Sequence, residues 1–258
     1  MTTYLPDDIA RIKQTLAKAS TLAKTFSPEG MKVEQKTNLD PVTEADLALD
    51  ELLRAELVRK DEGWLSEETA DDKQRLTKSK VWVVDPIDGT REFIVGIPDW
   101  VVSVALVEDN QPVGAGVLNP MRDELFIGGI NLGVTLNDIS CKVTDPGSLI
   151  GAKVLASLSE LRYGLWDALE KTPIDIIPRG SIAYKLALLA GGLVDATISL
   201  APKNEWDVAA GVLLVQAAGG KVTDLNGDPI RFNQADTLLN GVIAAGPRTW
   251  DMLWEILH

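Results

Sequence analysis

Histidine is almost absent from this chain. The one histidine is His258, the last of the 258 residues, and a chain end is a poor place for a catalytic base because it frays. This excludes Ser-His-Asp and Cys-His nucleophilic mechanisms, and also a histidine-rich zinc site. Any chemistry must therefore use carboxylates, hydroxyls, lysine, arginine or a bound metal ion.

Cysteine and long apolar runs are scarce as well. Cys141 is the single cysteine, so no disulfide can form within the chain, which favours a reducing compartment. No apolar run approaches the roughly 18 residues of a membrane span. The first residues also lack the basic and apolar regions of a signal peptide. We expect a soluble, cytoplasmic protein.

Basic residues are fewer than acidic residues in this chain. The chain has 25 lysines and arginines against 38 aspartates and glutamates, and a formal net charge of -13. A surface of this sign disfavours nucleic acid and anionic membranes as partners. A small anionic substrate remains compatible with it, because bound cations reverse the local field. The sequence is compatible with a monomer or a homodimer.

The first half of the chain predicts helices combined with an antiparallel sheet. Helices are expected over residues 5–26 and 43–57, the second opened by Thr43 and Asp46 in a capping-box pattern. Residues 81–84, 100–107, 112–118 and 125–130 have the pattern of strands. Residues 31–38 suit a strand or an exposed connection, and the charged stretch 71–80 suits a solvated loop.

The second half alternates between strand and helix patterns. Helices are expected near residues 161–171, 181–190 and 208–218, with strands over 153–157, 174–177, 195–199 and 242–245. This alternation favours an α/β region. We place a boundary near residue 145, which gives an α+β subdomain (1–145) and an α/β subdomain (146–258) packed as one compact unit.

The most informative motif follows the strand at residues 81–84. Asp85 ends this apolar run, Pro86 supports a sharp turn, and Asp88 returns a second carboxylate to the same side. The Ile87 carbonyl can lie between them, and such hard oxygen ligands suit Mg²⁺ or Mn²⁺. The next two residues, glycine and threonine, can open a helix whose free N–H groups receive a phosphate.

Three further acidic residues accompany this motif. Glu67 and Glu68 lie upstream after an apolar segment, and Asp207 lies far downstream where a helix is expected to begin. Each has an ordinary alternative when taken alone. Asp-Pro and Asp-Gly pairs form turns, paired glutamates are usually on the surface, and Asp207 suits a helix N-cap. Only their joint occurrence indicates a metal site.

The combination resembles the inositol monophosphatase superfamily of Mg²⁺-dependent, lithium-sensitive phosphatases, and the resemblance covers most of the chain. Its motifs are matched in family order by the segments Asp40–Asp46, Ser66–Glu68, Asp85–Thr90, Trp206–Gly211 and Gly219–Asp224. Several independent motifs in their expected contexts make the match specific. The resemblance implies a layered αβαβα sandwich.

The resemblance also implies metal ligands. By carry-over, Glu67, Asp85 and the Ile87 carbonyl hold a first Mg²⁺, and Asp85, Asp88 and Asp207 hold a second. Asp46 would lie near a third, weaker position. Mn²⁺ is a possible substitute, and inhibition by Li⁺ is expected.

Catalytic and phosphate-binding roles are implied in the same way. Glu68 and Thr90, with Asp46, would form the catalytic set that orients and deprotonates the attacking water. Asp88, Gly89 and Thr90 would surround the phosphate of a small phosphorylated metabolite.

The substrate is less defined. Arg91-Glu92-Phe93 is similar to the Lys-Glu-Phe of 3'(2'),5'-bisphosphate nucleotidases, whereas inositol monophosphatases often have Thr-Asn-Phe there. Ser181 and Lys185 lie where the family builds its substrate wall, and Lys185 suits a second phosphate. Both cations have surface alternatives, Lys185 as a helix-surface lysine and Arg91 as a helix-surface arginine.

The residues after the motif favour the bisphosphate nucleotidase. The alternatives are an inositol-1-monophosphatase, a broad sugar-phosphate phosphatase and, from another class, a non-catalytic family member that binds metal or ligand.

Overall fold

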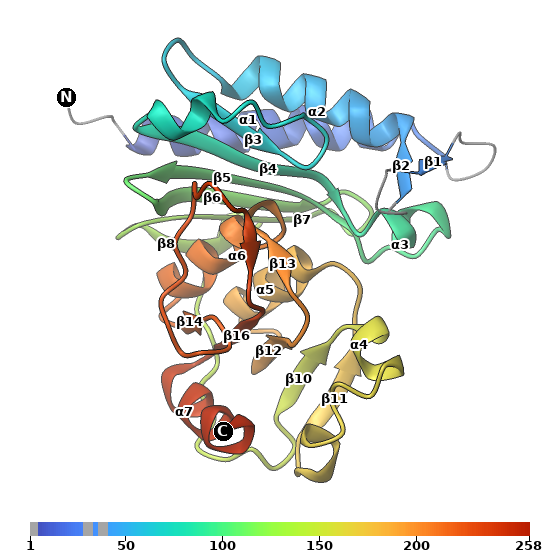
Figure 1. Ribbon diagram of the computed structural model, residues 1–258, viewed down its shortest axis with the longest axis vertical. Coiled ribbons are helices and arrows are strands. Elements are labelled where there is room, and N and C mark those ends of the chain that lie inside the picture. The colour runs from blue at the N-terminus through green and yellow to red at the C-terminus, as the bar shows by residue number, and fades with distance from the viewer. Residues whose placement is uncertain (1–4, 28–32, 36–40) are drawn as a thin grey trace.

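The computed structural model describes residues 5–27, 33–35 and 41–258, and its elements form five layers. Two helices cover one face of a seven-stranded sheet, two more lie between this sheet and a five-stranded sheet, and a C-terminal helix covers the far side (Figure 1). The predicted αβαβα sandwich is confirmed. Parts of the predicted segment 31–38, and Asp40, lie outside the described residues.

The larger sheet has the strand order β3-β4-β5-β6-β7-β8-β9. β3 (Gly63–Ser66) runs parallel to β4 (Lys80–Asp88), and the remaining neighbours are antiparallel. The other strands are β5 (Val101–Glu108), β6 (Gln111–Asn119), β7 (Glu124–Gly129), β8 (Gly133–Leu136) and β9 (Ile139–Cys141). A separate two-stranded pair joins β1 (Val33–Gln35) to β2 (Pro41–Thr43).

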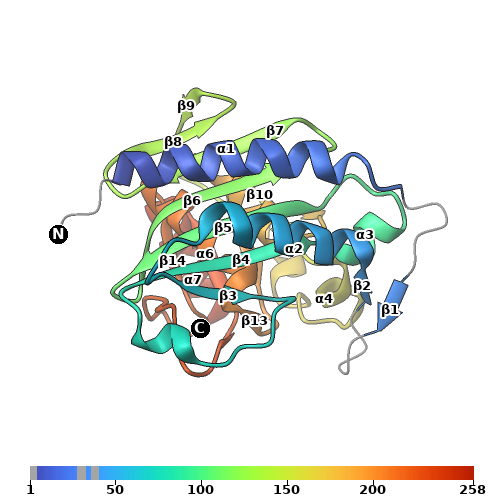
Figure 2. The same cartoon turned by 90° about the horizontal axis from the view of Figure 1, so that it is seen from above.

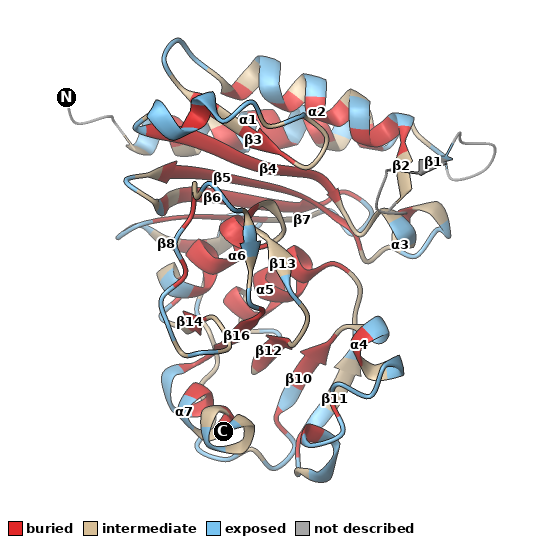
Figure 3. Cartoon of the chain, in the orientation of Figure 1, coloured by how far each residue is buried: buried red, intermediate tan, exposed pale blue. Residues whose placement is uncertain are grey.

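Both faces of the larger sheet are buried. α1 (Leu5–Ala23) and α2 (Glu44–Leu57) lie side by side across the outer face (Figure 2). Side chains alternate along a strand, so Trp82 and Val84 pack under these helices while Val81 and Val83 face the central helix layer. This two-sided burial explains why residues 81–84 are continuously apolar, and Figure 3 shows the central strands buried along their length.

The central helices are α5 (Ile182–Ala190) and α6 (Glu205–Ala217). They lie against a second sheet of order β11-β10-β12-β16-β14. Its strands are β10 (Lys153–Ala156), β11 (Asp175–Pro178), β12 (Ala196–Ser199), β14 (Lys221–Thr223) and β16 (Val242–Ala245). α7 (Pro247–Leu257) packs on its outer face, and β13 (Lys203–Asn204) pairs with β15 (Leu238–Leu239). Among the described residues, no helix is long and apolar enough to cross a membrane.

The two sheets are separate in sequence. The last strand of the larger sheet ends at Cys141, and the first strand of the smaller sheet begins at Lys153. This break falls where the boundary near residue 145 was placed. The division into subdomains itself stays a prediction, because α5 and α6 from the second half pack directly on the first sheet.

Two expectations are wrong. Residues 71–80 are not a plain solvated loop, because they contain a short helix, η1 (Gln74–Thr77), and Arg75 is only 2% exposed. The single helix expected near 161–171 is instead α4 (Leu158–Arg162) followed by η2 (Leu169–Lys171). Gly164, at φ +71°, has a left-handed backbone that ends the first helix.

Candidate active site

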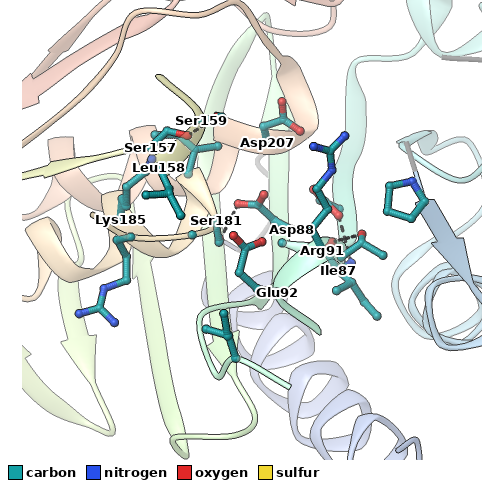
Figure 4. Close-up of a pocket in the computed structure, with 18 of the residues that line it drawn as sticks. Ile87, Asp88, Arg91, Glu92, Ser157, Leu158, Ser159, Ser181, Lys185 and Asp207 are labelled. Atoms are coloured by element: carbon teal, nitrogen blue, oxygen red, sulfur yellow. Dashed lines mark hydrogen bonds between the residues drawn. The ribbon is translucent and has the colours of Figure 1, made fainter. Parts of the chain in front are cut away.

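A cavity of about 680 Å³ opens where β4, α3 (Thr90–Ile94), α4, α5 and α6 meet (Figure 4). Ten of the twelve predicted site residues line it: Glu67, Asp85, Ile87, Asp88, Gly89, Thr90, Arg91, Ser181, Lys185 and Asp207. Asp46 and Glu68 are not among the lining residues. Glu67 and Asp207, which are 140 positions apart in the sequence, therefore line one cavity.

Three carboxylates come close together at the floor of this cavity. Each of Glu67, Asp85 and Asp207 offers an oxygen, and these oxygens lie within 4.8 Å of one another. Glu67 directly follows β3, and the register pairs Ser66 with Val84, so the parallel strands β3 and β4 deliver Glu67 and Asp85 to the same edge. Asp207 reaches them from the first turn of α6.

The segment from Asp85 to Asp88 remains part of β4 and does not leave the sheet as a turn. The register with β5 shifts between these residues, and the extra residue makes a β-bulge. The Ile87 N–H donates to Asp85 Oδ1 at 3.0 Å. Gly89 then adopts φ +100°, where an added Cβ would lie 3.1 Å from the Asp99 carbonyl oxygen. The bulge and this glycine together aim both aspartates at the cavity.

Asp88 joins the two halves of the molecule. Its Oδ2 accepts hydrogen bonds from the Ser181 hydroxyl and the Ala183 N–H, both at 2.6 Å. Ser181 caps α5 and also accepts from the Tyr184 N–H at 3.0 Å. The Ser181 hydroxyl therefore donates its proton to Asp88. The contact predicted between Ser181 and a phosphate stays a prediction.

Asp46 does not line the cavity but is hydrogen-bonded to Thr90, which does. The predicted capping box is confirmed, with Asp46 Oδ2 accepting from the Thr43 N–H at 2.8 Å. The Thr90 hydroxyl lies 3.2 Å from Asp46 Oδ1 and 3.0 Å from the Ile87 carbonyl oxygen. Asp46 thus reaches the cavity through Thr90.

Asp207 combines a cap with a place in the carboxylate cluster. It occupies the third position of α6, where its Oδ2 accepts from the Asn204 N–H at 2.8 Å. Glu205, two positions earlier in the chain, is fully buried. It accepts hydrogen bonds from the Asn233 and Gln234 N–H groups at 2.6 and 2.7 Å. These bonds fix the start of the helix that carries Asp207.

Burial and charge repulsion together set the electrostatics of the cluster. Burial, reinforced by Glu67, Asp88 and Asp207, raises the pKa of Asp85 well above its ordinary value. Burial raises the pKa of Asp88 to about 6, although the hydrogen bonds from Ser181 and Ala183 oppose this. Burial and the charge of Asp88 also raise the pKa of Asp207. Clustered carboxylates of this kind fit a divalent cation, which would remove the repulsion.

Lys185 lies in the cavity wall and is only 2% exposed. The surface-lysine alternative is therefore wrong. Burial lowers the pKa of Lys185 to about 8, against the attraction of Glu160. Within the described part of the chain, no carboxylate forms an ion pair with its ammonium group. A buried, unpaired cation beside a cavity is a site for an anion.

Several cavity residues escaped prediction from the sequence. They are the polar or charged residues Glu92, Ser157, Ser159, Arg162, Arg179 and Lys203. Glu92 adjoins a recognised motif, which is the one signal that pointed to it. Arg179 lies in the segment 178–185, which the resemblance places in the substrate wall. The others come from α4, β13 and a loop of the second half, where no local pattern marks them.

Comparisons with known proteins agree with this geometry. The sequence model of the inositol monophosphatase family matches residues 6–257. This chain belongs to the inositol monophosphatase family. It is a phosphatase of that family, and the expected family resemblance is confirmed.

Relatives within the family carry different names. The chain is 35% identical over 209 residues to a Nus factor SuhB of Xylella fastidiosa, covering 77% of this chain and 74% of that protein. It is 30% identical over 274 aligned positions to a 3'(2'),5'-bisphosphate nucleotidase CysQ of Aggregatibacter actinomycetemcomitans, covering 100% and 98%. A solved inositol monophosphatase from Zymomonas mobilis superposes with a TM-score of 0.82 at 26% identity, covering 99% of both chains.

Removal of divalent metal should make stability depend on pH. A carboxyl group whose pKa is raised on folding stabilises the fold below its unfolded pKa of about 4, and this contribution is lost as the pH rises through the folded value, about 6 for Asp88. Without metal, the free energy of unfolding should fall over this range. Saturating Mg²⁺ should raise the melting temperature by about 5–10 °C at pH 8 and by less at pH 5.

Thermal unfolding in EDTA and in MgCl₂ at matched ionic strength measures this difference. Asp207→Asn should reduce both the pH slope and the Mg²⁺ shift. Equal shifts at pH 5 and pH 8 would contradict the account.

Proposed function

We propose that the chain is a Mg²⁺-dependent phosphomonoesterase that hydrolyses a small phosphorylated metabolite with an activated water molecule. The observation that carries this proposal is the trio Glu67, Asp85 and Asp207 within 4.8 Å in the floor of a cavity. When bound, Mg²⁺ supplies charge neutralisation on the phosphoryl oxygens and a more acidic water. No histidine and no covalent phosphoenzyme is needed.

The carboxylates divide into ligands and positioning groups. Glu67, Asp85, Asp207, the free oxygen of Asp88 and the Ile87 carbonyl would hold the metal ions. Asp88 has its other oxygen fixed by Ser181 and Ala183 at 2.6 Å, so its ligand oxygen is oriented before metal or substrate arrives. Such preorganisation lowers the cost of assembling the charged site.

Proton transfer would run through Thr90. Its hydroxyl lies 3.2 Å from Asp46 Oδ1, so Thr90 can accept the proton of the attacking water while its own proton moves to Asp46. Glu68 is the second candidate for accepting the proton of the water, because the family resemblance implies that role. Asp88, Gly89 and Thr90 would surround the phosphate.

The preferred substrate is a 3'(2'),5'-nucleoside bisphosphate, such as 3'-phosphoadenosine 5'-phosphate, which would yield AMP. Lys185 supports this choice, because it is buried, faces the cavity and has no ion-pair partner among the described residues. The similarity to CysQ over the whole chain points the same way. An inositol-1-monophosphatase or a broad sugar-phosphate phosphatase is the alternative, and a non-catalytic binding protein is the different-class alternative.

Replacing Asp85 should abolish turnover without loss of the fold. Asp85→Asn keeps the side-chain volume and removes the central negative charge of the cluster, so Mg²⁺-dependent phosphate release should fall by at least about a hundredfold. The control is Asp109→Asn, at an exposed turn position with φ 49° that asparagine also accepts. Near-normal kcat in Asp85→Asn, with circular dichroism unchanged, would rule out this mechanism.

Replacing Lys185 should separate the candidate substrates. Lys185→Met keeps the apolar stem and removes the charge, and a hydrogen bond to a charged group is worth about 1.5–3 kcal/mol. The kcat/KM for 3'-phosphoadenosine 5'-phosphate should fall about ten- to hundredfold, whereas that for inositol 1-phosphate should change little. Both substrates and fructose 1,6-bisphosphate are assayed with and without Li⁺, which is expected to inhibit. An equal loss on mono- and bisphosphates would refute the second-phosphate site.

A further inference from the structure

Glu92 is a charged residue of the cavity to which no role has been given. It lies on α3, two positions after Thr90, and its side chain lines the cavity. Figure 4 shows its carboxylate beside Ser181 and below Asp88. It therefore lies next to the place where the phosphate ester is proposed to bind, but outside the carboxylate trio.

The position of the Glu92 side chain is fixed by its packing. A Cβ added to Gly180 would lie 2.6 Å from both Cγ and Cδ of Glu92, so the glutamate lies directly on the backbone of Gly180. Gly180 immediately precedes Ser181, which holds Asp88 at 2.6 Å. The Glu92 side chain therefore packs on the same segment that positions Asp88 through Ser181.

The Glu92 carboxylate lacks a donor from the rest of the described chain. Among the described residues, the carboxylate accepts a hydrogen bond only from its own backbone N–H. Lys185 and Arg91 attract Glu92 electrostatically, whereas Arg179 donates to both carboxylate oxygens of Asp99 at 2.7 and 2.9 Å. No ion pair joins Glu92 to Lys185 among the described residues. Burial raises the pKa of Glu92 above its ordinary value.

A half-buried acceptor of this kind is suited to a neutral donor. A phosphate would be repelled by the carboxylate, whereas a hydroxyl can donate to it and relieve the unmet acceptor. In the part of the cavity beyond the cluster, Lys185 is then suited to bind an anion, and Glu92 is suited to bind a hydroxyl group.

We propose that Glu92 binds a hydroxyl group of the substrate ring that carries the scissile phosphate, and so selects polyol and ribose esters over their deoxy counterparts. This inference rests on the proposed function, which places the scissile phosphate at the carboxylate cluster. For a 3'-phosphorylated ribonucleoside the group in question is the 2'-hydroxyl, on the carbon adjacent to the ester. Glu92 determines specificity and does not bind the phosphoryl group, which Asp88, Gly89 and Thr90 would surround.

The test removes the substrate hydroxyl and, separately, the Glu92 carboxylate, and compares the two effects. The kcat/KM values for 3'-phosphoadenosine 5'-phosphate and its 2'-deoxy analogue are measured for the wild type, Glu92→Ala and Glu92→Gln. The wild type should prefer the ribose ester by about ten- to hundredfold, the range for a hydrogen bond to a charged group. Glu92→Ala should reduce the preference to about twofold or less, and Glu92→Gln, whose amide oxygen still accepts, should retain an intermediate preference.

Controls separate this inference from the proposed function. Glu51→Ala, at an exposed position of α2, should keep the wild-type preference. If the wild type does not hydrolyse the bisphosphate, the nucleotidase proposal fails. The same comparison is then made with inositol 1-phosphate and its deoxy analogues.

Three results would overturn the role of Glu92. They are equal rates on hydroxyl and deoxy esters in the wild type, an unchanged preference in Glu92→Ala, and an equal loss on both esters in Glu92→Ala and Glu92→Gln. The last result would assign Glu92 to the phosphate site or to folding.

Discussion

Mutual repulsion among clustered carboxylates is the constraint on which this structure depends. Glu67, Asp85 and Asp207 are held with oxygens within 4.8 Å of one another, and isolated from their surroundings they would move apart or take up protons. The fold prevents separation, because two parallel strands and a capped helix fix the three backbones. The remaining ways to relieve the repulsion are protonation, which the raised pKa values reflect, and a divalent cation.

The layers of the sandwich supply the rigidity that such a site requires. β4 is buried from Lys80 to Ile87 and apolar on both faces over residues 81–84, so its end cannot shift without exposing core side chains. α5 and α6 belong to the second half of the chain but pack on the first sheet. Asp88 and Glu205 then anchor the starts of these helices through hydrogen bonds of 2.6–2.7 Å. Packing energy is thus used to hold a local arrangement that is electrostatically unfavourable without metal.

The sequence predicted the features that depend on residues close together in the chain. It did not predict the features that depend on contacts between distant segments. The motif from Asp85 to Thr90 and the capping box at Thr43 are local, and both were found. The parallel pairing of β3 with β4 was not predicted, because it joins segments separated by a loop. The burial of Lys185 and of Arg75 also depends on packing partners far away in the chain. The place of Glu92 in the cavity wall depends on its packing against Gly180, which is 88 positions away in the chain.

Proton release during Mg²⁺ binding tests the central claim most directly. If the cation replaces protons on the clustered carboxylates, calorimetric titration at pH 6 in buffers of different ionisation enthalpy should show net proton release, since the pKa of Asp88 alone is about 6. At pH 8 the release from Asp88 should be much smaller, because that carboxyl group is already ionised. Mg²⁺ binding without proton release at pH 6, or no Mg²⁺ binding at either pH, would contradict the account.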